Sequence, residues 1–475
     1  MKREFSAAAA WSGAASWIEQ AAGAVVFVVI ARIIGVENFG IAAMAFAFLF
    51  LGEFLVRDTI TEAIIERKSL EEGRLEATFV ILVGFSAIIV LILLGLSQVI
   101  ARIYGEPSVA PLLAVASPTV LLVGIGGVST ALLRRRMEYK TLAIRTIVGV
   151  VAGGVVGIAM ALNDFGAWSL VGQRVVELSI NTLLAILGAR WWPRRLPSRS
   201  DLGMVRGLGF RVLELRFWTL VVAQTPTVML GIFADPRSAG LFAFSARLVE
   251  VVLKVTVRVI QGVAQSAIAA LRRQTSATSQ FFLDLSELSA FVGFLSFTGL
   301  ALIASPLTRV LLGPDWDAAS EIIPFLCILG AAMALEAPQE AYLLATDRLE
   351  KFLKVVRLQA VIGLLLIGVA SLFGAVAVGI AVALRALVVL PLFTKAALSP
   401  EGIGAAEFLG AIRSPVIVSV VLAATLGLWR WLGFGQVGET LFVALSVSLG
   451  VLVAIVAVIG FMPATYARLK SYVQP

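Results

Sequence analysis

The chain has 475 residues, of which 60% are hydrophobic and only 14% are charged, and its formal net charge is +8. Soluble globular proteins contain about 45–50% apolar and about 25% charged residues, so this composition excludes a soluble protein and indicates a polytopic membrane protein. The single cysteine, Cys327, excludes disulfides and cysteine metal sites, and the lack of histidine removes the commonest metal ligand and near-neutral proton carrier.

Apolar segments long enough to cross a bilayer recur along the whole chain. The first is too long for the apolar core of a signal peptide, so we interpret it as a retained helix. The pattern predicts an all-α polytopic membrane protein with about fourteen transmembrane helices. These predicted helices span residues 7–34, 40–63, 76–103, 109–133, 140–162, 166–189, 207–233, 239–270, 283–309, 318–344, 354–372, 375–396, 415–433 and 438–461.

Basic residues gather in alternate loops. With a cytoplasmic N-terminus, most of the 38 Lys and Arg fall in cytoplasmic loops and tails, including clusters at 134–136, 190–199 and 272–273. This asymmetry predicts that both termini are cytoplasmic. It argues against a nucleic-acid partner, and it leaves membrane lipids as partners of the basic loops.

An internal repeat relates the two halves of the chain. Gly105 is followed 208 residues later by Gly313, and the triplet Phe165–Ala167 is matched at the same spacing by Phe373–Ala375. The segment around Gly40 aligns with the segment around Gly240. A repeat of six helices enters the membrane in the same direction twice, which is the plan of transporters with two parallel bundles and a substrate site between them.

The repeat predicts three regions. Residues 1–200 form an N-terminal six-helix bundle, and residues 201–400 form a C-terminal one. Residues 401–475 supply two extra helices and a cytoplasmic tail.

Charged residues inside apolar spans are costly, and they are therefore candidate functional residues. In the span 239–270, Arg247, Lys254 and Arg258 fall on one helical face, with Glu250 close by. One acid cannot balance three bases, so we favour an anion site over internal ion pairing. Arg216, in the preceding span, joins this cationic set.

The first half also carries charges within its spans. Glu53 and Arg57 lie four residues apart, which fits a structural ion pair, and we favour that interpretation. The alternative is a carboxylate that couples transport to H⁺ or Na⁺. Asp58 and Glu19 are further candidates for such coupling, and Glu250 could serve in coupling or in pairing.

Several turns resemble those of Wzx-type polysaccharide exporters. These exporters form the polysaccharide transporter branch of the multidrug/oligosaccharidyl-lipid/polysaccharide exporter superfamily. The matching segments are Ala31–Gly40, Leu132–Tyr139, Phe165–Leu170, Trp191–Pro193 and Leu311–Trp316.

The resemblance implies a V-shaped fold of two bundles and a flippase that works by alternating access in the bacterial inner membrane. The implied cargo is an undecaprenyl-diphosphate-linked oligosaccharide repeat unit, moved to the periplasmic leaflet for exopolysaccharide, capsule or O-antigen (lipopolysaccharide) export. A polysaccharide polymerase and co-polymerase are implied partners. No cofactor is implied, and coupling to H⁺, Na⁺ or the membrane potential stays open. The cationic cavity of the family suits Arg57, Arg216, Arg247, Lys254 and Arg258.

Four alternatives remain. The first two belong to the same superfamily: a lipid II-type peptidoglycan-precursor flippase and a cation-coupled drug exporter. An integral-membrane polymerase or ligase belongs to a different class, and the short external loops argue against it and favour a transporter over an enzyme. A membrane scaffold would give the intramembrane cations no purpose beyond ion pairing.

Overall fold

The computed structural model describes residues 2–57, 72–198, 201, 210–271, 275–346, 348–398, 403–432 and 438–461. Within these ranges it leaves undescribed the side chains of residues 2–19, 210–213, 258–259, 261–279, 458–459 and 461.

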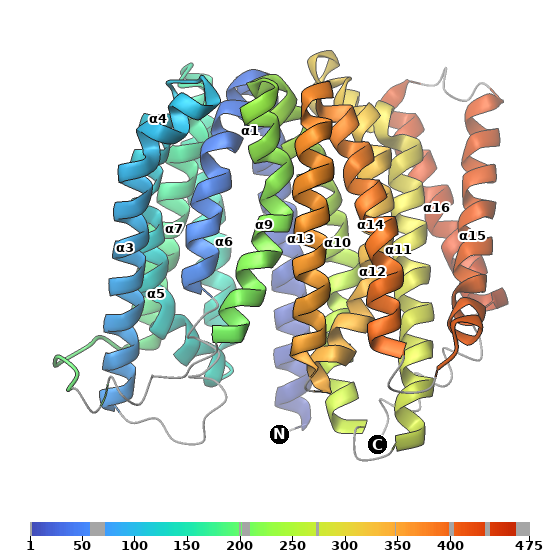
Figure 1. Cartoon of the computed structure of the whole chain (residues 1–475), viewed down its shortest axis with the longest axis horizontal. Helices are drawn as coiled ribbons and strands as arrows, with labels where there is room; N and C mark the ends of the chain where they lie inside the picture. The colour runs from blue at the N-terminus through green and yellow to red at the C-terminus, as the bar shows by residue number, and fades with distance from the viewer. Residues whose placement is uncertain are drawn as a thin grey trace. The chain divides into compact units, whose positions relative to one another are not determined.

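Every described element is a helix (Figure 1). In chain order the elements are α1 (Lys2–Arg57), α3 (Glu72–Tyr104), α4 (Val109–Ala116), α5 (Pro118–Arg135), α6 (Tyr139–Leu162), α7 (Trp168–Ala189), α9 (Phe210–Phe233), α10 (Pro236–Leu271), α11 (Thr275–Leu312), η1 (Pro314–Trp316), α12 (Ala319–Ala345), α13 (Leu349–Ala370), η2 (Ser371–Phe373), α14 (Ala375–Leu398), α15 (Ala405–Trp431) and α16 (Glu439–Phe461). The predicted all-α fold class is confirmed.

Twelve helices in the described part of the chain are long and apolar enough to cross a membrane. Helix α1 counts once among them, although it covers two predicted spans. Its helical geometry breaks at Gly35, with φ 77° and ψ 168°, between those two spans. Helix α10 is not among the twelve, since Arg247, Glu250 and Lys254 interrupt its apolar sequence. The protein is therefore a multi-pass membrane protein, and the number fourteen stays a prediction.

The chain divides into two compact units, Met1–Gly240 and Leu241–Pro475. The first contains α1 to α9 and the first residues of α10, and the second contains the rest of the chain. Helix α9 packs against α1, which places it in the first unit. The predicted boundaries at residues 200 and 400 stay a prediction.

Small residues bring helices of the first unit into close contact. Gly149, Gly153 and Gly157 of α6 face α7, and a Cβ on Gly153 would lie 2.7 Å from the carbonyl oxygen of Gln173. These small-xxx-small steps allow α6 and α7 to pack closely.

A second close approach joins α1 to the start of α10 inside the first unit. A Cβ on Gly40 would overlap the carbonyl oxygen of Pro236, and a Cβ on Gly240 would lie 3.0 Å from the Cα of Gly40. The two glycines that the internal repeat pairs in sequence are thus in backbone contact. Any side chain at either position would have to push the two segments apart.

The glycines in the turns that the repeat pairs share the sign of φ. Gly105, Gly166, Gly313 and Gly374 all have positive φ, at 66°, 52°, 89° and 90°. Only glycine adopts this region without a steric cost, so the spacing of these glycines reflects equivalent turns in the two halves.

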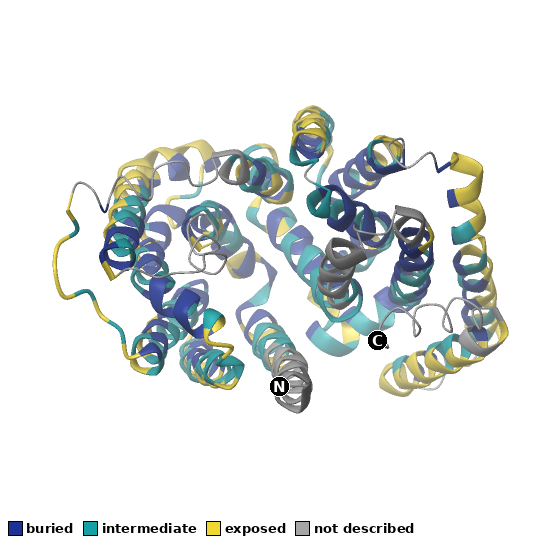
Figure 2. Cartoon of the chain, turned by 90° about the horizontal axis from the view of Figure 1, so that it is seen from below, coloured by how far each residue is buried: buried dark blue, intermediate teal, exposed yellow. Residues whose placement is uncertain are grey.

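In the second unit, α11 contacts α12, α15 and α16. Near one end of α11, the ring of Phe282 packs on Tyr342 and Phe408, with centroid distances of 5.3 and 6.5 Å. Further along, Phe291 and Leu295 join buried residues of α15 and α16. Figure 2 shows that α15 and α16 are otherwise largely exposed, as expected for helices that face lipid.

Candidate functional site

A buried ion-pair cluster links three helices of the first unit. Glu53 of α1 is 3% exposed, and both of its carboxylate oxygens accept from Arg174 of α7. Oε1 also accepts from the hydroxyl of Thr119 on α5, at 3.1 Å. Glu177 accepts from Arg174 at 3.4 Å, and the Arg174 guanidinium lies 5.5 Å from the centroid of the Phe50 ring.

This arrangement satisfies Glu53 within the protein. Arginine presents its donors to a carboxylate as a planar fork, which fixes the geometry of both side chains. Removing Glu53 or Arg174 would break this buried ion pair, at a cost of about 3–5 kcal/mol. The geometry supports a structural role for Glu53, as the clamp between α1, α5 and α7.

Two predicted cations lie near this cluster. Arg57 is half-exposed and approaches Glu53 at 3.9 Å, at the longest range of an ion pair. Arg216 of α9 lies over the ring of Phe54 on α1, 5.6 Å from its centroid. Arg57 therefore ends α1, and Arg216 lies beside its last turns.

In the second unit, three charges of α10 form a chain. Glu250 accepts from Arg247 at 2.8 Å through one carboxylate oxygen and from Lys254 at 2.7 Å through the other. The three side chains are between 35% and 44% exposed. The trio carries two positive charges and one negative charge, so its net charge is positive.

The adjoining face of α10 is buried. Val249, Leu253 and Val257 are each at most 5% exposed, and they repeat every four residues along the helix. The charged trio therefore lies on the accessible side of an amphipathic helix. An oxyanion could reach Arg247 and Lys254 without displacing packed side chains.

Three predicted residues cannot be placed in the same detail. Asp58 lies outside the described residues, and the side chains of Glu19 and Arg258 lie outside the described part of their helices. Glu53, Arg57 and Arg216 belong to the first unit, and Arg247, Glu250 and Lys254 belong to the second. Sequence reasoning missed Arg174 and Thr119 as partners of Glu53, because local spacing carries no signal for contacts between distant segments.

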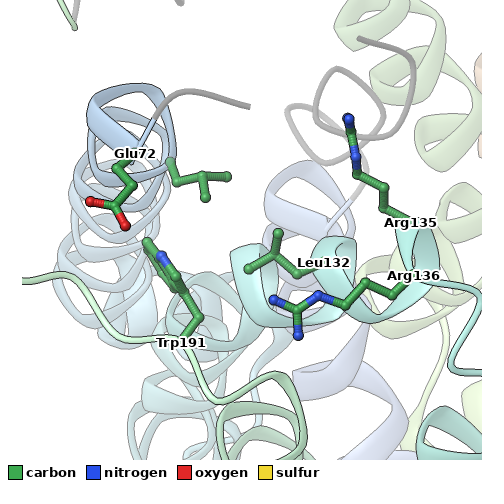
Figure 3. A pocket seen from close by; sticks show the side chains of 6 residues that line it. Glu72, Leu132, Arg135, Arg136 and Trp191 are labelled. Atoms are coloured by element: carbon green, nitrogen blue, oxygen red, sulfur yellow. The ribbon is translucent and has the colours of Figure 1, made fainter. Parts of the chain in front are cut away.

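A pocket of about 340 Å³ lies at one end of the first unit (Figure 3). Glu72 and Trp191 lie on one side of it, and Arg135 and Arg136, from the end of α5, lie on the other. Arg136 donates to the carbonyl oxygen of Ala189 at 3.0 Å. The pocket thus mixes both charge signs, and one of its arginines already binds the backbone at the end of α7.

The segment that follows α7 packs on α3 and hydrogen-bonds to it beside this pocket. Glu76 accepts from the backbone and side chain of Arg195, the latter at 2.7 Å, and this bond raises the pKa of the Arg195 guanidinium. Trp191 and Trp192 both contact the ring of Phe79. The double-tryptophan motif is therefore an anchor of the basic loop on α3. Among the described residues, no group of acidic or cysteine side chains is suited to hold a metal ion.

Comparisons with known proteins support the assignment of family and fold. A family model described as "Polysaccharide biosynthesis protein" matches residues 29–321. The succinoglycan biosynthesis transport protein ExoT of Rhizobium meliloti (strain 1021) is 23% identical over 300 residues, which cover 63% of this chain and 61% of that protein. The lipopolysaccharide biosynthesis protein WzxC of Escherichia coli (strain K12) is 21% identical over 351 residues, which cover 72% of this chain and 70% of that protein.

Solved structures match over more of the chain. The lipid II flippase MurJ, in an inward closed conformation, aligns with a TM-score of 0.77 and 14% identity over 94% of this chain and 97% of its own. An inward-facing multidrug resistance MATE family transporter aligns with a TM-score of 0.64 and 13% identity, over 81% of this chain and 96% of its own. At these identities the likeness concerns the fold alone.

The match of the family model decides the identity of the chain. It covers well over half of the 475 residues and includes the predicted turns from Ala31 to Trp316. The resemblance predicted from those turns is confirmed: the chain belongs to the polysaccharide biosynthesis protein family.

Proposed function

We propose that the protein is a flippase for a lipid-linked oligosaccharide in the inner membrane of a bacterium. The cargo is a repeat unit carried on undecaprenyl diphosphate, and the product is used to assemble a surface polysaccharide. Membership of the family supports this proposal, as does the fold shared with a lipid II flippase. The names of the two relatives point to the same class of process.

The observation that carries the proposal is the charged face of α10. Arg247 and Lys254 are accessible, lie seven residues or about 10 Å apart along the helix, and share the single carboxylate of Glu250. A diphosphate offers more negative charge than one carboxylate, and it can accept from both the arginine fork and the lysine ammonium. These two residues are the proposed diphosphate contacts.

The remaining predicted residues complete the proposal. Arg57, Arg216 and Arg258 supply further positive charge to the path of the diphosphate. Glu19 and Asp58 are the proposed coupling carboxylates, with H⁺ or Na⁺ as the ion, and the membrane potential is an alternative driving force. A polysaccharide polymerase and co-polymerase would use the exported units. Both termini lie in the cytoplasm, as the distribution of basic residues predicts.

The test is complementation of a strain that lacks the gene. Lys254→Ala, Arg247→Ala and the double variant are expected to lose surface polysaccharide while the protein still inserts in the membrane. Lys140→Ala is the control, since Lys140 is an exposed lysine near the basic end of the first unit. Normal export from the double variant would contradict the assignment of the diphosphate contacts.

Analysis of lipid-linked intermediates in the deletion strain tests the function itself. A complete repeat unit that accumulates on the cytoplasmic side supports a flippase, and its mass identifies the cargo. Accumulation on the periplasmic side would point to a polymerase. Accumulation of a peptidoglycan precursor would point to lipid II transport, and unchanged intermediates together with drug sensitivity would point to a drug exporter.

A further inference from the structure

A groove between α13 and α14 has no place in the proposed transport function. It has a volume of about 340 Å³ and lies where α13 begins and α14 ends, in the second unit. Three lysines line it: Lys351 and Lys354 from α13, and Lys395 from the last turn of α14. None of its lining residues is acidic.

The lysines are accessible to a ligand. All three are exposed. The carboxylate of Glu350 approaches Lys354 at 3.8 Å, but both side chains are 70% exposed, so water screens this pair and its strength is small. The pocket at the end of α5 differs, because Glu72 lines it together with its arginines.

Packed side chains join the helices that flank the groove. Phe352 and Phe393 are buried, and their ring centroids are 5.6 Å apart, which holds α13 against α14. One residue further along α14, Thr394 accepts from the Gln339 amide of α12 at 3.0 Å. The ring contact holds α13 against α14, the hydrogen bond joins α14 to α12, and the three lysines stay exposed.

The groove continues into an apolar surface. Val355, Leu358 and Leu392 complete its lining on the side toward the middle of the helices. Beyond them, exposed aliphatic residues repeat every three or four positions on both helices: Val361, Leu365 and Val369 on α13, and Leu384 and Val388 on α14. This stripe extends about 16 Å from Lys354 to Leu365, a length comparable with half the apolar core of a bilayer.

We propose that this groove binds an anionic phospholipid of the bilayer, with its phosphate held by Lys351, Lys354 and Lys395 and its acyl chains along α13 and α14. The lysines lie at the helix ends, which is the depth of lipid phosphates, and the aliphatic stripe runs inward from them. A neutral phospholipid brings no net negative charge to the three lysines. A soluble phosphate would leave the apolar stripe unused.

The experiment measures lipid binding to the purified, delipidated full-length protein in detergent. The thermal midpoint is followed as phosphatidylglycerol is added, with phosphatidylcholine of the same acyl chains and water-soluble glycerophosphoglycerol as comparison ligands. Phosphatidylglycerol is expected to raise the midpoint in a saturable, salt-sensitive way, because a ligand that binds the folded state stabilises it. The two comparison ligands are expected to have little effect.

Variants then locate the site. Each of Lys351→Gln, Lys354→Gln and Lys395→Gln is expected to weaken phosphatidylglycerol binding by about fivefold, and the triple variant by more. The matched control carries Lys140→Gln, Arg413→Gln and Arg430→Gln, three exposed cations outside the groove, and it is expected to bind as the wild type does. All six positions are exposed, so folding is expected to be unaffected.

Several results would overturn the proposal. These are equal stabilisation by phosphatidylcholine, equal stabilisation by the soluble headgroup, and equal loss of binding in the groove and control variants. Protection by a polyprenyl diphosphate that is lost in the groove variants, with no protection by phosphatidylglycerol, would instead assign the groove to the cargo. None of these outcomes depends on whether the protein is a flippase.

Discussion

Two carboxylates inside the helices have different surroundings, and this separates a structural residue from a candidate functional one. Glu53 is buried and bound on both oxygens by Arg174. Glu250 also uses both oxygens, but its partners Arg247 and Lys254 are more than a third exposed. Burial makes the first pair costly to break, whereas solvent access allows the partners of the second to be exchanged for a ligand.

Glu53→Gln is expected to destabilise the protein, because Arg174 would keep its charge in a buried site and lose the carboxylate that accepts two of its hydrogen bonds, leaving only Glu177 at 3.4 Å. The expected loss is about 3–5 kcal/mol. The measurement is the thermal midpoint of the purified protein, with Arg57→Ala as the control, since that arginine is half-exposed and 3.9 Å from Glu53. A control variant that falls as far as Glu53→Gln would contradict the clamp.

Glu250→Gln is expected to tighten the binding of a polyprenyl diphosphate to the purified protein. The substitution removes the one negative charge between Arg247 and Lys254, so both cations become available to the ligand. The expected gain is about fivefold, equivalent to about 1 kcal/mol. Glu407→Gln on the exposed face of α15 is the control, and weaker binding after Glu250→Gln would contradict the proposed role of the trio.

At the scale of elements, the contact between Gly40 and Gly240 is the feature that tolerates least change. The backbone of α1 there meets the first turn of α10 with no room for a methyl group. Overpacking a rigid contact costs about 1–3 kcal/mol even where side chains can adjust, and here the opposing atoms belong to the backbone. The repeat pairs Gly40 with Gly240 in sequence, and each of the two glycines supplies one side of this contact.

Gly40→Ala and Gly240→Ala are therefore each expected to lower the yield and the thermal midpoint of the membrane-inserted protein. Gly95→Ala on α3 is the matched control, because a Cβ there would meet nothing within 4 Å. That substitution should be neutral or slightly stabilising, since alanine is the better helix former. Equal behaviour of the three variants would show that the close approach is absent in the membrane.

At the scale of the whole molecule, the repeat and the charge distribution together predict the topology. Two copies that enter the membrane in the same direction put equivalent turns on the same side. The turns at Gly105 and Gly313 are paired by the repeat and should therefore lie on the same side, and the charge distribution places that side outside the cell. The basic ends, which include Lys140 and Lys351, should face the cytoplasm.

Cysteine labelling checks this topology in a Cys327→Ser background. Ser108→Cys and Asp315→Cys, both at exposed positions next to the glycine turns, are expected to react with a membrane-impermeant maleimide in intact cells. Lys140→Cys and Lys351→Cys should react only after the cells are permeabilised. Opposite accessibility of Ser108→Cys and Asp315→Cys would contradict the parallel repeat.

The sequence by itself determined the membrane class, the helical fold, the positions of most turns and the family. An apolar span predicts a transmembrane helix, because backbone polar groups must be satisfied within the chain in lipid. Turn glycines such as Gly105 and Gly374 predict a local backbone conformation. Both predictions depend on local sequence alone. The charged face of α10 could also be predicted from the sequence, since helical spacing places Arg247, Glu250 and Lys254 together.

Only the tertiary structure decided which of these groups meet across helices. Arg174 lies 121 residues from Glu53, Gly240 lies 200 residues from Gly40, and Lys395 completes a groove begun by Lys351 and Lys354. Helical periodicity gives the face of a residue but not the helix that packs against it. The packing of distant segments therefore decides which charged side chains are buried in ion pairs and which are accessible to a ligand.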